Sequence, residues 1–185
     1  MHDTHERRGH DFEIVAFDAG AADAAEKQRV AREVTALHAA YYCGEWQFGA
    51  RFAQEVESDL AEFLQRFDPV RDRLWFARAG GETVGAVAID GGRDRRADPR
   101  LRWFILDPRM QGRGAGRQLI ARALEFCRSS GAARVHLWTF AGLEKARRLY
   151  DRAGFVLVEE TADDAWGRRV THQRFELELA DCGRG

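Results

Sequence analysis

The sequence predicts a single domain of the mixed α/β class, with about seven strands in one central sheet and about four helices against it. Three observations lead to this prediction. Apolar strand-like runs and amphipathic helical stretches follow one another in the order β-α-α-β-β-β-α-β-α-β-β. The composition, 45% hydrophobic and 32% charged residues, is typical of a globular protein. A length of 185 residues suits one buried core, and neither a repeat nor a linker divides the chain.

We expect the domain to cover residues 12–180, between short tails at 1–11 and 181–185. In its first half, apolar residues from Phe52 to Phe67 recur on one helical stripe, and Gly80-Gly81 forms the turn of a hairpin. The elements predicted there are a strand at 12–17, a helix at 21–42 that glycines break within 41–49, a second helix that ends at Asp68-Pro69, and hairpin strands at 73–79 and 83–90.

The second half alternates strands with helices. The run 101–106 is apolar on both faces, which is typical of a central strand, and a charged loop at 91–100 precedes it. Gly131 and Gly154 are expected to end the two helices. The remaining predicted elements are a helix that ends near 130–131, a strand at 134–140, a helix at 143–154, and strands at 155–160 and 170–180.

The segment 107–116, DPRMQGRGAG, places three glycines between a predicted strand and a predicted helix. Glycine lets the backbone approach a ligand closely, and the first turn of a helix offers unpaired N–H groups that attract anions. Two known phosphate-binding patterns are excluded. A dinucleotide fingerprint needs a glycine where the chain has Arg117, and a P-loop needs a Gly-Lys-Ser/Thr sequence that the segment lacks. The segment therefore predicts an anion site of another kind.

Two motifs carry a family resemblance. The loop fits the pattern Q/R-x-x-G-x-G/A at Gln111, Gly114 and Gly116. The last helix fits A-x-x-L-Y-x-x-x-G-F, with matches at Ala146, Leu149, Tyr150, Gly154 and Phe155. Both motifs resemble those of the GNAT superfamily of acetyl-coenzyme A-dependent N-acetyltransferases. The section 102–160 is similar to the acetyltransferase half of proteins that fuse this domain to a MarR-type winged helix, and we expect the chain to carry that half alone.

The resemblance implies a GNAT fold and direct transfer of an acetyl group from acetyl-coenzyme A (acetyl-CoA) to a primary amine. In that family, amides of the glycine loop bind the pyrophosphate, and a backbone N–H at the bulged end of the central strand binds the oxyanion. A glutamate at Gly114 or Gly116 is expected to block acetyl-CoA and to leave the fold intact. The implied cofactor-binding residues are Phe104, Ile105, Leu106, Gln111, Gly112, Arg113, Gly114, Ala115, Gly116 and Arg117.

One position departs from the family pattern. Many members have an asparagine three residues before the helix alanine, where it contacts the cofactor, and this chain has Leu143 there. The resemblance therefore implies that another group makes this contact. We expect Thr139 or a backbone amide to replace the asparagine.

The resemblance also implies a general acid for the leaving thiolate. Tyr150 occupies the family's usual position, and a phenol with a pKa of about 10 can protonate a thiolate whose conjugate acid has a pKa of about 8.5. The alternative is a core tyrosine that closes the last helix. For the general base, Glu45 is the first candidate and Asp90 the second. Both equally fit solvated surface carboxylates, and ordered water can take this role.

The segment 41–49, YYCGEWQFG, is expected to help form the acceptor pocket, as the segment between the first two helices commonly does in the family. Its aromatic residues surround one carboxylate, Glu45, and ring faces beside an anion suit an ammonium group. The alternative is that these aromatic residues only pack the helix junction. The candidate acceptor-binding residues are Tyr42, Trp46, Phe48 and Arg102.

Charge and hydropathy exclude several classes of protein. A formal net charge of −1 argues against a protein that coats nucleic acid or an anionic membrane. No apolar run approaches the roughly 18 residues that a membrane span needs. Residues 1–11 lack the apolar core of a signal peptide, so the expected location is cytoplasmic. The widely spaced cysteines, and the histidines in that first segment, predict neither a disulfide framework nor a metal site.

A small-molecule amine is the expected acceptor, with acetyl-CoA as cosubstrate. Two alternatives stay open: a non-catalytic module that senses acyl-CoA, and an acetyltransferase that acts on protein N-termini or lysines. Release of coenzyme A with a candidate amine separates an enzyme from a sensor. The oligomeric state also stays open, a homodimer included.

Overall fold

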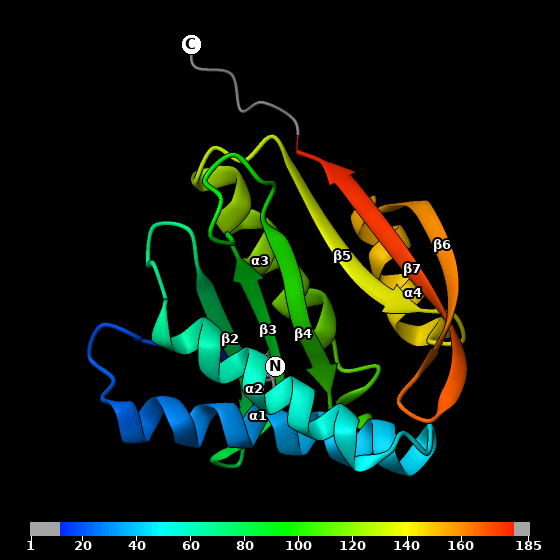
Figure 1. Cartoon of the computed structure of the whole chain (residues 1–185). Helices are drawn as coiled ribbons and strands as arrows, with labels where there is room; N and C mark the ends of the chain where they lie inside the picture. The colour runs from blue at the N-terminus through cyan, green and yellow to red at the C-terminus, as the bar shows by residue number, and fades with distance from the viewer. Residues whose placement is uncertain (1–11, 180–185) are drawn as a thin grey trace, which may run out of the picture.

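The computed structural model describes residues 12–179, and the predicted tails at 1–11 and 181–185 lie outside this range. A seven-stranded sheet crosses the molecule in the order β1-β2-β3-β4-β5-β7-β6 (Figure 1). The strands are β1 (Glu13–Ala16), β2 (Arg73–Ala79), β3 (Glu82–Asp90), β4 (Arg100–Leu106), β5 (Arg134–Phe140), β6 (Val156–Ala165) and β7 (Arg168–Glu178). The helices are α1 (Ala24–Glu45), α2 (Ala50–Gln65), α3 (Ala115–Ser129), α4 (Glu144–Ala153) and a short 3-10 helix, η1 (Pro108–Met110).

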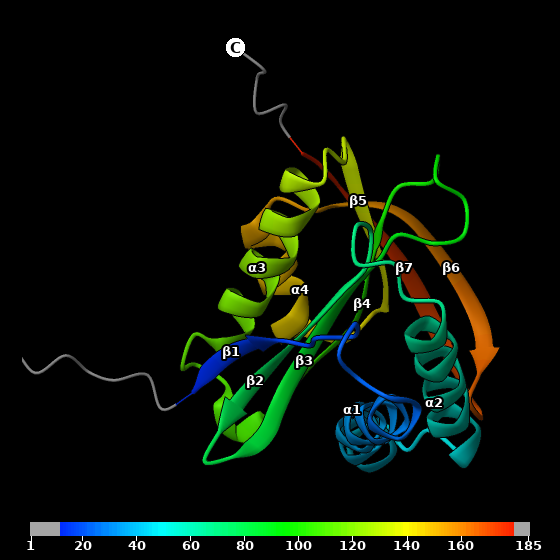
Figure 2. The same cartoon turned by 90° about the vertical axis from the view of Figure 1, so that its left-hand side faces the viewer.

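Helices cover both faces of the sheet (Figure 2). α1 contacts β3 and β4 on one face with α2 beside it, and α3 contacts β2, β3 and β4 on the other. Strand alternation builds a core on each face, since Leu74 and Phe76 of β2 join one core while Trp75 and Ala77 join the other. The predicted fold class is confirmed. Within residues 12–179, no helix is both long and apolar enough to cross a membrane.

β4 and β5 form the parallel pair of this sheet, whose other pairs are antiparallel. The two strands are in register at two positions, where Arg100 lies opposite His136 and Leu101 opposite Leu137. Beyond these residues the strands diverge, as Figure 1 shows. This divergence positions the candidate site, because the cavities described below lie along it.

A β-bulge interrupts β4 beside the divergence. The register with β3 shifts between Ala86 and Ala88, so that Trp103 and Phe104 together oppose one residue. Trp103 has a φ of 48°, in the left-handed region that few residues other than glycine adopt. The bulge brings the consecutive side chains of Arg102 and Trp103 to the same face of the sheet. Arg102 forms an ion pair with Asp59 of α2, and Trp103 packs in the core beneath α1 and α2.

The end of α1 differs from the prediction. The helix continues to Glu45, beyond the expected end at Tyr42 and through Gly44. Tyr41 and Tyr42 pack against the buried clusters of this face. Packing of this last turn outweighs the low helix propensity of a single glycine, which costs about 1 kcal/mol.

The last two strands also differ from the prediction. β6 extends to Ala165, and β7 starts at Arg168, so the two form a long hairpin. Trp166 and Gly167 make its two-residue turn, with φ values of 53° and 90°. Most β6 side chains are exposed, so no apolar alternation marks the strand in the sequence.

Candidate active site

The glycine loop adopts a conformation that requires its glycines. Gly112 and Gly114 have φ values of 78° and 90°, which residues with a side chain rarely adopt. Gly114 is the N-cap of α3 and provides no side-chain hydrogen bond to the first turn of that helix. The N–H groups of this turn are therefore oriented to bind an anion.

A basic cavity of about 960 Å³ lies beside this loop, between α3 and α4. Apolar side chains such as Met110, Ile120 and Leu149 form part of its wall. No carboxylate lines this cavity among residues 12–179, so its charge suits a ligand with several phosphates. The basic residues that line it are Arg113, Arg117, Arg128, Lys145, Arg148 and Arg152.

Gly116 has a different role from the other loop glycines. A Cβ atom at this position would lie 3.1 Å from Cδ1 of Leu149 and 3.3 Å from Cζ of Phe104. These distances are tight for carbon contacts, so the glycine allows α3 to pack closely against β4 and α4. A glutamate at Gly116 would press against these two side chains, so we expect this variant to lose folding stability, whereas the loop pattern alone predicted that the fold would stay intact.

A middle cavity of about 370 Å³ continues from the basic cavity along the end of β4. It shares Leu106, Gln111 and Leu149 with the basic cavity. It shares Tyr42 and Phe104 with a third cavity, so the three are contiguous. The predicted cofactor-binding residues of β4 all line the middle cavity: Phe104, Ile105 and Leu106.

The third cavity, which we call the aromatic cavity, has a volume of about 640 Å³ and lies on the α1/α2 side of the sheet. Helices α1 and α2 form one wall, β4 and β5 the floor, and the β6–β7 hairpin the other wall. Rings combined with carboxylates suit a cationic ligand. The rings are those of Tyr42, Phe52, Trp103, Phe104, Trp138, Phe140, Tyr150 and Trp166, and the carboxylates are those of Glu55, Asp59, Glu159 and Asp163.

Tyr150 reaches the aromatic cavity from α4, on the opposite face of the sheet. Its side chain is 5% exposed and packs in the core of that face, with the ring centroid of Phe104 at 5.9 Å. The pKa of the Tyr150 phenol lies well above its usual value, mainly because the phenol is buried and to a lesser extent because Tyr42 is nearby. The phenol therefore carries its proton throughout the neutral range and has the protonation state that a general acid requires.

His38 lines the same cavity, although no sequence motif marks it. Its Nδ1–H donates to the carbonyl oxygen of Val34 at 2.9 Å, and its ring stacks near that of Tyr42 at 6.0 Å. Burial lowers the pKa of His38 to about 4, so the ring is neutral and Nε2 is an acceptor. The only signal of His38 in the sequence is its position one helical turn after the apolar Val34.

The predicted bulged end of the central strand is present, with its centre at Trp103 and Phe104 rather than at 104–106. A bulge leaves one residue of the strand out of the ladder. Both bulge residues line the aromatic cavity, and Phe104 also lines the middle cavity. A backbone N–H at this junction is the candidate oxyanion donor.

Leu143, which replaces the family's asparagine, is the N-cap of α4 and makes no side-chain hydrogen bond. It packs instead with Phe48, Phe140 and Val170 in a small buried cluster. The residues at the start of α4 line the middle cavity, so backbone amides there remain candidates for the missing contact. Thr139, the other candidate, lines the aromatic cavity.

The segment 41–49 contributes less to the acceptor side than predicted. Tyr42 lines the aromatic cavity, but Trp46 and Phe48 line none of the three cavities. Phe48 is 3% exposed, and Trp46 covers Gly142 and Phe140. These two rings pack the helix junction, which was the alternative. The exposed Glu45 lines the middle cavity rather than the aromatic one.

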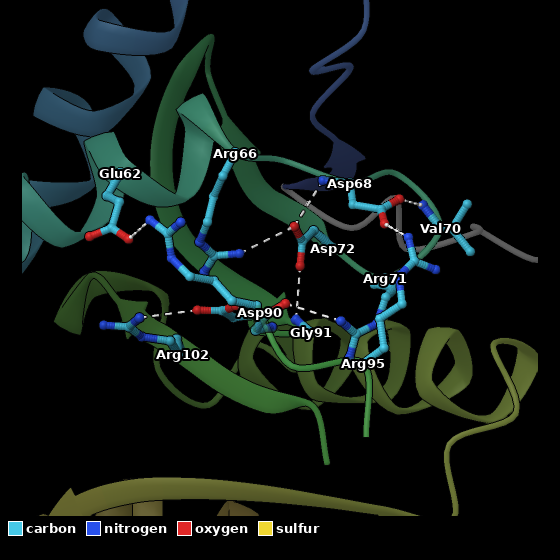
Figure 3. Close-up of polar contacts among 12 residues, drawn as sticks. Glu62, Arg66, Asp68, Val70, Arg71, Asp72, Asp90, Gly91, Arg95 and Arg102 are labelled. Carbon is cyan, nitrogen blue, oxygen red and sulfur yellow. Dashed lines mark hydrogen bonds and ion pairs between the residues drawn. The ribbon is translucent and has the colours of Figure 1, made fainter. Parts of the chain in front are cut away.

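Arg102 lines the aromatic cavity as predicted, but Asp90 lines none of the three cavities. Asp90 accepts hydrogen bonds from Arg66 at 2.6 Å and from Arg102 at 3.1 Å (Figure 3). Burial alone would raise the pKa of Asp90, but these bonds and one from the Gly92 N–H lower it instead. The second candidate base is therefore a structural ion-pair partner.

No sequence motif identifies the other residues of the aromatic cavity. Glu55, Asp59, Arg100 and His172 come from three separate elements, and only folding brings them together. Within residues 12–179, no three metal-ligating side chains gather in one place. The chemistry that this arrangement supports is recognition of a phosphate-bearing ligand on one side of the sheet and of a charged small molecule on the other.

Residues 33–155 match the model of the acetyltransferase (GNAT) family. A mycothiol acetyltransferase of Beutenbergia cavernae is 45% identical over 123 residues, which are 66% of this chain and 40% of that protein. An N-acetylaspartate synthetase of Danio rerio is 33% identical over 109 residues, 58% of this chain and 38% of that protein. The chain thus spans less than half the length of these relatives.

Solved structures share the fold at low sequence identity. An acetyltransferase from Streptococcus agalactiae has a TM-score of 0.70 at 17% identity, over 91% of this chain and 99% of that one. A proposed acetyltransferase of Salmonella typhimurium, with its cofactor acetyl-CoA, has a TM-score of 0.68 at 18% identity, over 95% of this chain and 97% of that one. Since the family model covers most of the chain, the chain belongs to the GNAT acetyltransferase family, and residues of both sequence motifs line the three cavities.

Proposed function

We propose that this protein transfers the acetyl group of acetyl-CoA to the primary amine of a small molecule. The observation that carries the proposal is that the three cavities adjoin one another in series. The basic and middle cavities share Leu106, Gln111 and Leu149, and the middle and aromatic cavities share Phe104 and Tyr42. Tyr150 lies at the second of these junctions, on the side of the aromatic cavity. The basic cavity would hold the phosphates, the middle cavity the arm of the cofactor, and the aromatic cavity the amine. The Salmonella structure, with acetyl-CoA and the same fold, supports this assignment.

The reaction follows from these positions. A neutral amine in the aromatic cavity attacks the thioester carbonyl and forms the C–N bond, and the carbonyl oxygen becomes an oxyanion. A backbone N–H at the bulge of Trp103 and Phe104 donates to that oxygen. Collapse of the tetrahedral intermediate breaks the C–S bond, and Tyr150 donates its proton to the leaving thiolate. The proton lost by the new amide nitrogen passes through water and restores the phenol.

Deprotonation of the incoming ammonium group is assigned to Glu45 or to ordered water. Glu45 lies on the middle cavity, so it would act through a water molecule rather than by direct contact with the amine. The rings that line the aromatic cavity would attract the ammonium form before it loses its proton.

An acceptor screen tests the proposal directly. The purified protein is incubated with acetyl-CoA and a library of amines, and free coenzyme A thiol is measured together with the mass of each product. We expect thiol release in step with N-acetylated product. Thiol release without an acetylated amine would identify a hydrolase, and acetyl-CoA binding without release from any acceptor would identify a non-catalytic module.

A further inference from the structure

Most charges in the aromatic cavity are paired within the protein. Nη2 of Arg102 lies 2.6 Å from Oδ2 of Asp59, and Glu55 accepts a hydrogen bond of 2.7 Å from the indole N–H of Trp166. Arg100 differs, because it makes no ion pair and no side-chain hydrogen bond with any residue of 12–179. Its Nε is buried without a partner although the residue lines the cavity.

The residues around Arg100 form no ion pair with it. Arg102 follows on the same face of β4, and His136 lies opposite on β5 with its Nδ1 also buried and unpartnered within the described range. Asp90, the residue opposite on β3, is already held by Arg66 and Arg102 (Figure 3). Asp90 and Asp59 lie near enough to favour the charged guanidinium, but no carboxylate of residues 12–179 forms an ion pair or a hydrogen bond with Arg100.

The electrostatic state of this corner agrees with the geometry. Burial, and next the charge of Arg102, lowers the pKa of Arg100 to about 10, so the guanidinium stays charged at neutral pH. Burial, and next the charges of Arg174 and Arg100, lowers the pKa of His136, so its ring is neutral there. A desolvated cation beside a second cation is unfavourable until an anion approaches, and such groups concentrate at functional sites.

We propose that Arg100 binds a carboxylate of the acceptor, so that the substrate is an amine that also carries a carboxylate. This inference rests on the proposed function and specifies its substrate class. A guanidinium forms two parallel hydrogen bonds with a carboxylate, which gives the contact both strength and orientation.

The position of Arg100 also sets the shape of the substrate. Four residues, or roughly 10 to 13 Å of strand, separate Arg100 from Phe104 at the bulge. The arginine side chain covers only part of that distance. An amine at the bulge and a carboxylate at Arg100 must therefore be several bonds apart, which favours ω-amino acids over glycine.

Matched pairs of acceptors test this inference. Glycine, 4-aminobutanoate and 6-aminohexanoate are compared with n-alkylamines of the same chain length and with the corresponding aminoalkylphosphonates. In the wild-type protein we expect kcat/KM for the longer amino acids to exceed that for their alkylamines by at least about tenfold, as a charge-assisted hydrogen bond allows. Arg100→Gln should abolish the preference, Arg100→Lys should keep part of it, and the exposed Arg29→Gln should keep all of it.

Controls separate this inference from folding and from the proposed function. Arg100→Gln should retain or raise the Tm, because it removes an unpaired buried charge. Acetylation of alkylamines without any carboxylate preference would overturn the inference and leave the function standing, and a preference for phosphonates would overturn the carboxylate assignment. If no amine is acetylated, calorimetry that measures hexanoate binding to the coenzyme A-loaded protein decides whether Arg100 binds a carboxylate. Binding that Arg100→Gln abolishes supports the carboxylate site alone, and absence of binding overturns it.

Discussion

The basic cavity and the aromatic cavity, on opposite faces of one sheet, are built in different ways. The basic cavity is formed by one continuous loop–helix segment together with α4, and its chemistry depends on backbone N–H groups and like charges. The aromatic cavity takes side chains from two helices, two central strands and the β6–β7 hairpin, and its charges are of both signs. A cavity formed by local backbone tolerates few substitutions of its glycines. In a cavity assembled from side chains, a single substitution can change which ligand binds.

The largest expected effect is on the backbone-built side. Gly114→Glu should weaken acetyl-CoA binding at least about a hundredfold, because it adds a carboxylate beside the phosphates. The left-handed conformation of Gly114, with its φ of 90°, adds strain of about 1 to 2 kcal/mol. Calorimetry on the folded variant measures the loss, and Gly114→Asn, which tolerates this conformation without a charge, serves as the control. Equal affinity in the wild type and Gly114→Glu would remove the loop from the site.

Gly116→Glu sharpens this comparison within the same loop. Because a side chain there meets Leu149 and Phe104, the expected loss is in folding stability, by about 2 kcal/mol or more. Urea unfolding of both glutamate variants distinguishes the two roles. A Gly116→Glu protein as stable as Gly114→Glu would contradict the packing role.

At the junction of the two cavities, Tyr150→Phe should lower kcat by about 10²-fold through loss of general-acid catalysis. The affinity for acetyl-CoA should stay unchanged, because the ring keeps its packing against Phe104 and Phe155. Pre-steady-state kinetics and calorimetry measure the two quantities. A kcat within about twofold of the wild type, where chemistry limits the rate, would make Tyr150 a structural residue.

On the side of the aromatic cavity, His38 should make the folding stability of the protein depend on pH. Its folded-state pKa of about 4 lies below the usual 6.5, so the unfolded chain binds more protons between these values and stability falls as pH drops through them. We expect this residue to contribute a loss of about 2 kcal/mol between pH 7 and pH 5. Urea unfolding of the wild type and His38→Phe at both pH values measures it. An undiminished pH dependence in the variant would assign the effect elsewhere.

The smallest expected effect is that of Glu45→Gln. Glu45 is exposed and lies on the middle cavity, so the change should lower kcat/KM for the amine by less than about threefold. Steady-state kinetics over a range of pH measures it. A drop beyond about tenfold together with a shifted pH profile would identify Glu45 as the general base.

The contrast between the two cavities also explains what the sequence could predict. The glycine loop and Tyr150 lie in continuous motifs whose spacing is visible in the chain, and the amphipathic segments predicted the sheet and its helices. Trp46 and Phe48 looked similar to Tyr42 in sequence, but only the fold decides which ring faces a cavity. No periodicity marks the β6–β7 hairpin, because most β6 side chains face solvent on an edge strand.

Because β4 and β5 diverge, each has a stretch of unpaired backbone in the middle of the sheet. Main-chain groups beyond Leu101 and Leu137 face a gap, and an exposed strand edge pairs readily with an extended chain that offers amides. The arm of coenzyme A contains amide groups of this kind, so in the gap it would serve as a short additional strand. Its binding should then slow amide hydrogen exchange along β4 and β5 and make the two antiparallel halves of the sheet unfold as one cooperative unit.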